Sequence, residues 1–298
     1  EVDWDYAVEK LIEYRRPNAA ITCLNTILYK KKKINSDLAV KALLEAVTTE
    51  EPIYTFDVHG TVKVIKALQD NPEVSPNDLF SIEWAYLQIL TGPGNSGTPE
   101  FLEQKLAAEP DFFCELIRRI YRSKNEPEIR KETTEQEKAI ATNAWRLLKE
   151  WKRIPGMDSE RNLSPQQFQK WLQEVKTKCE ESGHFDVAMI TLGEALIYSP
   201  SDPDGLWIHK TVAEALNSED GDPLRRGYYL GIVNSRGAHW VDPTGKPEKE
   251  LAAKYRQQAE EVENAGFHRF ASKLRDLAKN YEEQAKQIIE EHNNENHI

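Results

Sequence analysis

Apolar side chains recur at intervals of three and four residues along most of the chain. Near its beginning, Trp4, Ala7, Leu11 and Tyr14 follow this spacing, which places them on one face of a helix. Pro17 then ends that helix and also suits the first turn of the next one. The same pattern predicts helices over 4–14, 17–33, 37–47, 59–68, 76–90, 99–109, 110–121, 134–151, 165–182, 187–198, 206–216, 247–264 and 267–291.

The clearest start of a helix is at Ser164. Serine is a favoured N-cap, Pro165 suits the first helical position, and Gln167 stands three residues after the cap, as in a capping box. The segment 79–90 is less simple, because its apolar residues alternate as in a strand and also satisfy helical spacing. We predict a helix there as well.

A charged stretch without an apolar face divides the chain. Residues 124–133 form this linker, between an N-terminal helical-hairpin subdomain at 1–123 and a second helical subdomain at 134–298. An insertion rich in glycine and aromatic residues interrupts the second subdomain at 221–245. Helix pairs joined by short turns predict an all-α fold, an irregular α-α superhelix in which each hairpin packs against the next.

One predicted hairpin carries a recognisable set of residues. Its spacing resembles the tetratricopeptide (TPR) repeat, in which small residues let two helices approach closely and a proline ends the second. The residues that carry the resemblance are Trp171, Gly183, Ala188, Leu192, Ala195 and Pro200. The resemblance implies a concave surface that binds a peptide or a partner domain.

A degraded copy of the same register lies at the N-terminus. Trp4, Ala20, Leu24 and Ile27 occupy equivalent places, but arginines replace the turn glycine and Lys32 replaces the proline. The resemblance therefore covers about two units of roughly 34 residues, of which only the second is good. The chain also looks like the helical C-terminal regions of large uncharacterised bacterial proteins, a likeness that implies no activity.

The net charge of the chain restricts the classes of molecule that it is expected to bind. The chain of 298 residues has 39 Lys and Arg against 50 Asp and Glu, a formal net charge of −11. Nucleic-acid binding draws on clustered cations, so we expect no nucleic-acid partner. The sequence contains no apolar run of the length, about 18 residues, that a membrane span needs.

The cysteines indicate the compartment. Cys23, Cys114 and Cys179 lie far apart and within apolar patterns, which fits reduced thiols in the cytoplasm. Their spacing does not fit a metal site, and the histidines are isolated, so we predict no metal ligands. The chain starts with Glu1 and shows no signal peptide, and we interpret it as a fragment of a longer protein.

Two short motifs have simple structural interpretations. Gly92, Gly94 and Gly97 form a GxGxxG string, but a predicted helix precedes it and Pro93 removes one amide, so we interpret it as a loop rather than a dinucleotide site. The lysines at 30–33 complement the dipole of the helix that they end. We therefore predict no cofactor. No catalytic residue can be assigned, although a Ser-His-Asp or Cys-His grouping of residues remote in sequence stays open.

The insertion at 221–245 contains the best candidate for a ligand site. Arginines, aromatics and a histidine in a short β-hairpin near 229–241 would hold a phosphate or carboxylate by bidentate contacts and stacking. The candidate ligand-binding residues are Arg225, Arg226, Tyr229, Asn234, Arg236, His239 and Trp240. We favour the competing interpretation, in which the segment is a packing insertion, Trp240 fills a gap and Arg236 pairs with a carboxylate.

The leading hypothesis is a non-catalytic protein-interaction or scaffold module of a larger cytosolic, bacterial protein, with a protein or peptide partner. The alternative is a ligand-sensing or enzymatic domain with an anionic-ligand site at 225–242. A third hypothesis is a homo-oligomer formed through the charged C-terminal helices after Pro247.

Overall fold

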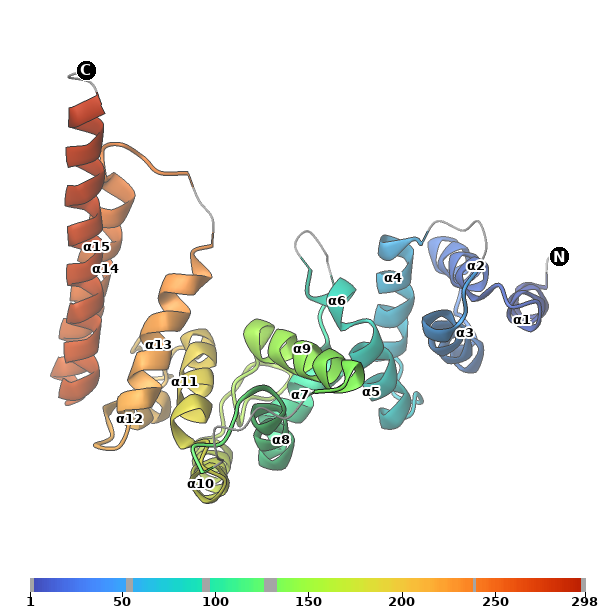
Figure 1. The fold of residues 1–298 in the computed structure, drawn as a ribbon, viewed down its shortest axis with the longest axis horizontal. Coiled ribbons are helices and arrows are strands. Elements are labelled where there is room, and N and C mark those ends of the chain that lie inside the picture. The colour runs from blue at the N-terminus through green and yellow to red at the C-terminus, as the bar shows by residue number, and fades with distance from the viewer. Residues whose placement is uncertain (1–2, 52–55, 93–96, 126–132, 238–239, 296–298) are drawn as a thin grey trace. The chain divides into compact units, whose positions relative to one another are not determined.

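The computed structural model describes residues 3–51, 56–92, 97–125, 133–237 and 240–295. Over these ranges the chain is helical and contains no strand, which confirms the all-α prediction (Figure 1). The nearest approach to a sheet is one isolated bridge between Met157 and Leu163. None of the helices in the described ranges is both long and apolar enough to cross a membrane.

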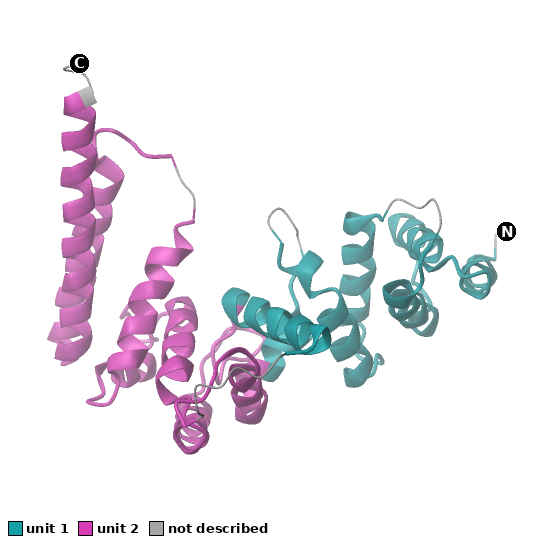
Figure 2. Ribbon diagram, in the orientation of Figure 1, with its two compact units in different colours: residues 1–105, 131–150 teal, residues 106–130, 151–298 magenta. Residues whose placement is uncertain are grey.

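The chain forms two compact units, which Figure 2 distinguishes by colour. Unit 1 comprises residues 1–105 and 131–150, and unit 2 comprises 106–130 and 151–298. Helix α7, Glu100–Ala108, passes from the first unit into the second. The other helices of unit 1 are α1 Trp4–Glu13, α2 Pro17–Tyr29, α3 Ser36–Thr48, α4 Val58–Gln69, α5 Pro76–Ala85, α6 Leu87–Leu90 and α9 Glu135–Glu150.

Unit 2 contains one short 3₁₀ helix and seven further α-helices in its described part. They are α8 Pro110–Ile120, α10 Pro165–Glu181, α11 Phe185–Ala195, η1 Leu196–Tyr198, α12 Lys210–Asn217, α13 Asp222–Ser235, α14 Lys246–Asn264 and α15 His268–Glu295. The two units do not follow the division proposed at 124–133. Helix α9 follows that linker yet packs on α6 of unit 1, and α8 precedes it yet packs on α10 of unit 2.

Helices α1 to α5 enclose the core of unit 1. The apolar stripes that the periodicity predicted face inward, and Val8, Leu24, Leu43 and Ile65 are fully buried. Burial of each such side chain stabilises the fold by about 1.5–3 kcal/mol. The segment 79–90 is helical, as predicted, but it breaks at Tyr86 into α5 and α6, and the Tyr86 hydroxyl donates to the Leu43 carbonyl at 2.8 Å.

A buried carboxylate joins three segments of unit 1. Glu83 on α5 has no exposed surface. Its oxygens accept hydrogen bonds from the backbone N–H groups of Leu102 (2.9 Å) and Phe101 (3.0 Å) and from the side-chain amide of Gln69 (2.7 Å). The first amides of a helix have no partner within that helix, so Glu83 acts as a cap for α7.

Aromatic rings and close helix contacts organise the core of unit 2. Phe113, Trp151 and Trp171 lie with ring centroids 5.1–6.1 Å apart, and the Trp171 indole donates to the Leu106 carbonyl at 3.1 Å. Helix α11 follows α10 through Gly183, whose φ of 71° is readily adopted by glycine. The helix start predicted at Ser164 is confirmed, since its hydroxyl accepts from the Gln167 N–H.

Helices α11 and α13 approach each other through glycines. A Cβ built on Gly193 of α11 would lie 2.2 Å from the Leu224 carbonyl oxygen, and one built on Gly227 of α13 would lie 2.0 Å from the Ile190 carbonyl oxygen. Only residues without a side chain fit at such a crossing. The small residues of this region therefore serve the α11–α13 contact.

The β-hairpin expected near 229–241 is wrong for residues 229–235, which belong to α13. The reason is packing. Leu224, Tyr228 and Ile232 recur every four residues and are all buried, so the segment has a helical apolar stripe that its glycines and aromatics obscured in the sequence. The two C-terminal helices lie close to their predicted positions at 247–264 and 267–291, and Tyr255 of α14 stacks on Tyr281 of α15 at 5.7 Å.

Candidate functional site

Arg225, the first residue of the expected anion site, forms hydrogen bonds within the protein. Its side chain is 9% exposed, and its guanidinium donates to the carbonyls of Leu216 (2.9 Å) and Ser218 (2.8 Å) at the end of α12. Burial lowers the pKa of Arg225, while the nearby carboxylate of Asp222 opposes that shift. The positive charge thus satisfies helix-end carbonyls, which carry partial negative charge.

Replacing Arg225 with alanine tests this structural role. We expect the free energy of unfolding to fall by about 2 kcal/mol, because one buried and one partly buried carbonyl lose a charged donor. Arg226 is the matched control, since it is exposed on the same helix. Arg226→Ala is expected to change stability by less than about 0.5 kcal/mol. Urea unfolding followed by circular dichroism measures both values, and equal losses in the two variants would contradict the assignment.

Arg236 also forms an ion pair within the protein. Its guanidinium lies 2.5 Å from the carboxylate of Glu248, which is buried, and 5.7 Å from the ring centre of Tyr281. This ion pair confirms one part of the packing interpretation. The other part is wrong, because the Trp240 side chain is 91% exposed and fills no gap.

The remaining candidates have separate surroundings. Tyr229 is partly buried, with the Lys273 ammonium 5.3 Å from its ring centre, and Asn234 is exposed. His239 lies outside the described residues. Among the six described candidates, Arg225 and Arg236 have acceptors within the protein, so their guanidinium groups are already used there.

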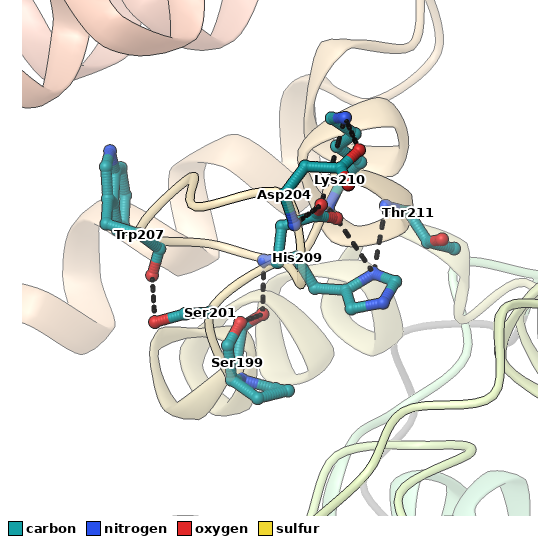
Figure 3. A network of polar contacts seen from close by, with 9 residues as sticks. Ser199, Ser201, Asp204, Trp207, His209, Lys210 and Thr211 are labelled. Atoms are coloured by element: carbon teal, nitrogen blue, oxygen red, sulfur yellow. Dashed lines mark hydrogen bonds and ion pairs between the residues drawn. The ribbon is translucent and has the colours of Figure 1, made fainter.

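A polar network closes the loop between η1 and α12 (Figure 3). Asp202 accepts hydrogen bonds from the backbone N–H groups of Asp204 (3.0 Å) and Lys210 (2.8 Å). Burial raises the pKa of this carboxyl, but the two N–H donors and the nearby Lys210 ammonium outweigh burial and hold the pKa below its ordinary value. The loop geometry therefore favours the ionised form.

Ser199, Asp202 and His209 form the kind of trio that hydrolases use, but their geometry is structural. His209 Nδ1 accepts from the Thr211 N–H at 3.2 Å and caps α12, while Asp202 Oδ2 lies 4.0 Å from that nitrogen. The Ser199 hydroxyl bonds to the backbone of Pro200 and His209 (3.0 and 3.3 Å). A nucleophilic triad needs the serine hydroxyl on the imidazole, so the network stabilises the loop.

Unit 1 contains an open hollow between two helix connections. One connection runs from α2 to α3 and the other from α4 to α5, and the Asn71 side-chain amide donates to the Ser36 hydroxyl between them at 2.8 Å. The hollow has a volume of about 1060 Å³. The residues that line it are Leu28, Lys31, Lys32, Lys33, Ile34, Asn35, Ser36, Asp37, Val40, Ala67, Asp70, Asn71, Pro72, Glu73, Val74, Ser75 and Asp78.

Charges of both signs line this hollow. Lys31, Lys32 and Lys33 are exposed and make no ion pair with any residue in the described ranges. Glu73 and Asp78, on the second connection and in the first turn of α5, also form no ion pair there, whereas Asp70 pairs with Lys66 at 3.2 Å. The lysines do follow a helix end, as the dipole interpretation expects, but the sequence did not indicate that they line a hollow.

Exposed tyrosines occur on, or just after, the first two helices. Tyr29, at the end of α2, is 84% exposed, Tyr14 after α1 is 76% exposed, and Tyr6 is 59% exposed. The described residues contain no group of three or more His, Cys, Asp or Glu side chains placed to hold a metal ion.

No family model, no curated protein and no solved structure matches the chain.

Proposed function

We propose that the chain is a TPR-like protein-interaction module that binds a segment of a partner protein in the hollow of unit 1. The observation that carries the proposal is the group of lysines at 31–33, exposed on the hollow without ion pairs among the described residues. Acidic side chains of the bound segment would face these lysines, and basic ones would face Glu73 and Asp78. Such opposed charges fix the direction of a bound segment.

The size of the hollow supports a peptide occupant. At about 1060 Å³ it is slightly larger than the roughly 300–1,000 Å³ typical of small-molecule pockets, and both charged residues and apolar residues such as Leu28 and Val40 line it. Tyr29 provides exposed amphipathic surface next in sequence to the hollow-lining Leu28. Tyrosine is enriched at protein interfaces, where a rigid ring contributes contact area at low entropic cost.

We propose the cytosol as the site of action. Cys23, Cys114 and Cys179 are free thiols, which suits a reducing compartment. The net charge of −11 supports a protein partner rather than a nucleic acid. The alternative ligand-sensing site at 225–242 has less support, because Arg225 and Arg236 already have acceptors within the protein.

A randomised peptide library displayed on phage tests the proposal with the full chain. We expect recovered peptides to contain an acidic cluster, and to lose at least tenfold in affinity when Lys31, Lys32 and Lys33 are all replaced with alanine. Loss of three charge contacts at a partly screened surface accounts for about 1.4 kcal/mol or more. Fluorescence titration of the synthesised peptides at two salt concentrations measures the affinity.

The matched control replaces three exposed lysines of unit 1 outside the hollow, Lys41, Lys63 and Lys138, with alanine. It lowers the net charge by the same amount, so it shows how much of the effect is long-range. Peptides that bind the two triple variants equally well, or a library that yields no specific binder, would overturn the proposal.

A further inference from the structure

Two buried thiols meet between helices α8 and α10 of unit 2. Cys114 and Cys179 are 65 residues apart in sequence, and their Sγ atoms lie 3.6 Å apart. Their residues are 0% and 1% exposed. Thiols at this separation share a hydrogen bond, and they need to move closer by about 1.5 Å to reach a disulfide length of about 2.05 Å.

The surroundings hold the two helices in place around this pair. Lys178 pairs with Asp111 across the same two helices. Beyond the end of α8, the Ser123 hydroxyl donates to the Ser182 carbonyl at 2.7 Å, and a His184 ring nitrogen lies 3.1 Å from the Tyr121 carbonyl oxygen. These contacts keep the sulfurs adjacent without a covalent bond.

The two thiols are not equivalent. The hydrogen bond with Cys179 lowers the pKa of Cys114 against the effect of burial, and the positive charges of Arg118 and Lys178 lower it further. The same hydrogen bond raises the pKa of Cys179. The thiolate is the reactive form of cysteine, so Cys114 is the nucleophile of the pair and Cys179 is the second thiol.

We propose that Cys114 and Cys179 form a reversible, redox-sensitive lock between α8 and α10. With hydrogen peroxide as the two-electron oxidant, the Cys114 thiolate attacks one oxygen, the O–O bond breaks, and a sulfenic acid and hydroxide result. This hydroxide takes up the proton that the Cys114 thiol released, which gives the first water. Cys179 then attacks the Cys114 sulfur, its thiol proton neutralises the leaving hydroxide, and an S–S bond and water form. The net change is two thiols and one peroxide to one disulfide and two waters. A small-molecule dithiol reverses it by exchange.

The lock closes a long loop of the chain. A disulfide between residues 65 positions apart restricts the unfolded ensemble, so the oxidised protein unfolds at a higher temperature than the reduced one. Because both sulfurs are buried, peroxide reaches them only when the helices separate locally. Oxidation of the pair is therefore slower than oxidation of an exposed thiol. The oxidised protein is more stable against unfolding than the reduced protein.

The experiment treats the full chain with hydrogen peroxide under native conditions and maps disulfides by mass spectrometry of proteolytic peptides. We expect a Cys114–Cys179 cross-link in most molecules, loss of two hydrogens in the intact mass, and a rise in Tm on the order of 5–10 °C that dithiothreitol reverses. Cys23 is partly exposed and is the control thiol. Cys23→Ser is expected to leave the cross-link and the Tm rise unchanged.

Cys179→Ser is expected to abolish both the cross-link and the Tm rise and to leave Cys114 open to further oxidation. The cross-link in the unsubstituted protein decides the question even where a serine variant fails to fold. Three results would overturn the proposal: no cross-link under native conditions, a cross-link that forms only in denaturant, or a Cys23-containing disulfide in its place.

Discussion

The Gly227→Ala variant is expected to lose more than about 3 kcal/mol of unfolding free energy, because the added methyl group meets backbone. The new Cβ would lie 2.0 Å from the carbonyl oxygen and 2.7 Å from the carbonyl carbon of Ile190 on α11. Helix propensity alone predicts the opposite sign, since alanine stabilises a helix interior by about 1 kcal/mol relative to glycine. The steric effect is larger here, because neither helix can move without opening the core around it.

Chemical unfolding of the full chain measures the free energy that the variant loses. Two further variants test whether the clash at the crossing causes this loss. Gly193→Ala places a methyl group 2.2 Å from the Leu224 carbonyl oxygen at the same crossing, so we expect a loss of similar size. Asn234→Ala lies on the exposed side of α13 and is expected to be neutral or stabilising by up to about 0.5 kcal/mol. If Gly227→Ala is as stable as the unsubstituted chain, α11 and α13 do not cross at the proposed distance.

The region around this crossing contains one helix start that the sequence predicts and one helix that it does not. The start of α10 at Ser164 followed from capping chemistry, which is local, and the structure agrees. The sequence does not predict helix α13, because glycine has two opposite uses, as a turn residue and as a point of close helix approach. Gly227 and Gly231 serve the second use, and only the position of the backbone of α11 reveals it.

The candidate sites depend on contacts between distant residues in the same way. The hollow of unit 1 exists because the connection at 30–35 lies beside the one at 70–75, where Asn71 reaches Ser36. The thiol pair joins residues 65 positions apart. The sequence shows which charged residues and cysteines occur at each of these places. It does not show that the two connections, or the two cysteines, lie close together, because that proximity arises from tertiary packing.

Glu83 gives the second large effect. We expect Glu83→Leu to lower the free energy of unfolding by about 3–4 kcal/mol, because a side chain of similar size leaves the N–H groups of Phe101 and Leu102 without their acceptor. Glu83→Gln retains one carbonyl oxygen and is expected to lose about half as much. Ser81→Ala, on the exposed side of α5, is the control and is expected to change stability by less than about 0.5 kcal/mol.

The pH dependence separates the charge of Glu83 from its hydrogen bonds. Burial raises the pKa of Glu83 above its ordinary value, although the N–H groups of Leu102 and Phe101 and the Gln69 amide act in the opposite direction. A raised carboxyl pKa means that the folded state binds the proton more tightly than the unfolded state does. The stability present below the unfolded pKa of about 4.3 is therefore lost as the pH rises through the folded pKa. Urea unfolding at several pH values measures the difference in unfolding free energy between the unsubstituted chain and Glu83→Gln. We expect this difference to shrink as the pH rises. A difference that grows would show that hydrogen bonding to the carboxylate outweighs its burial.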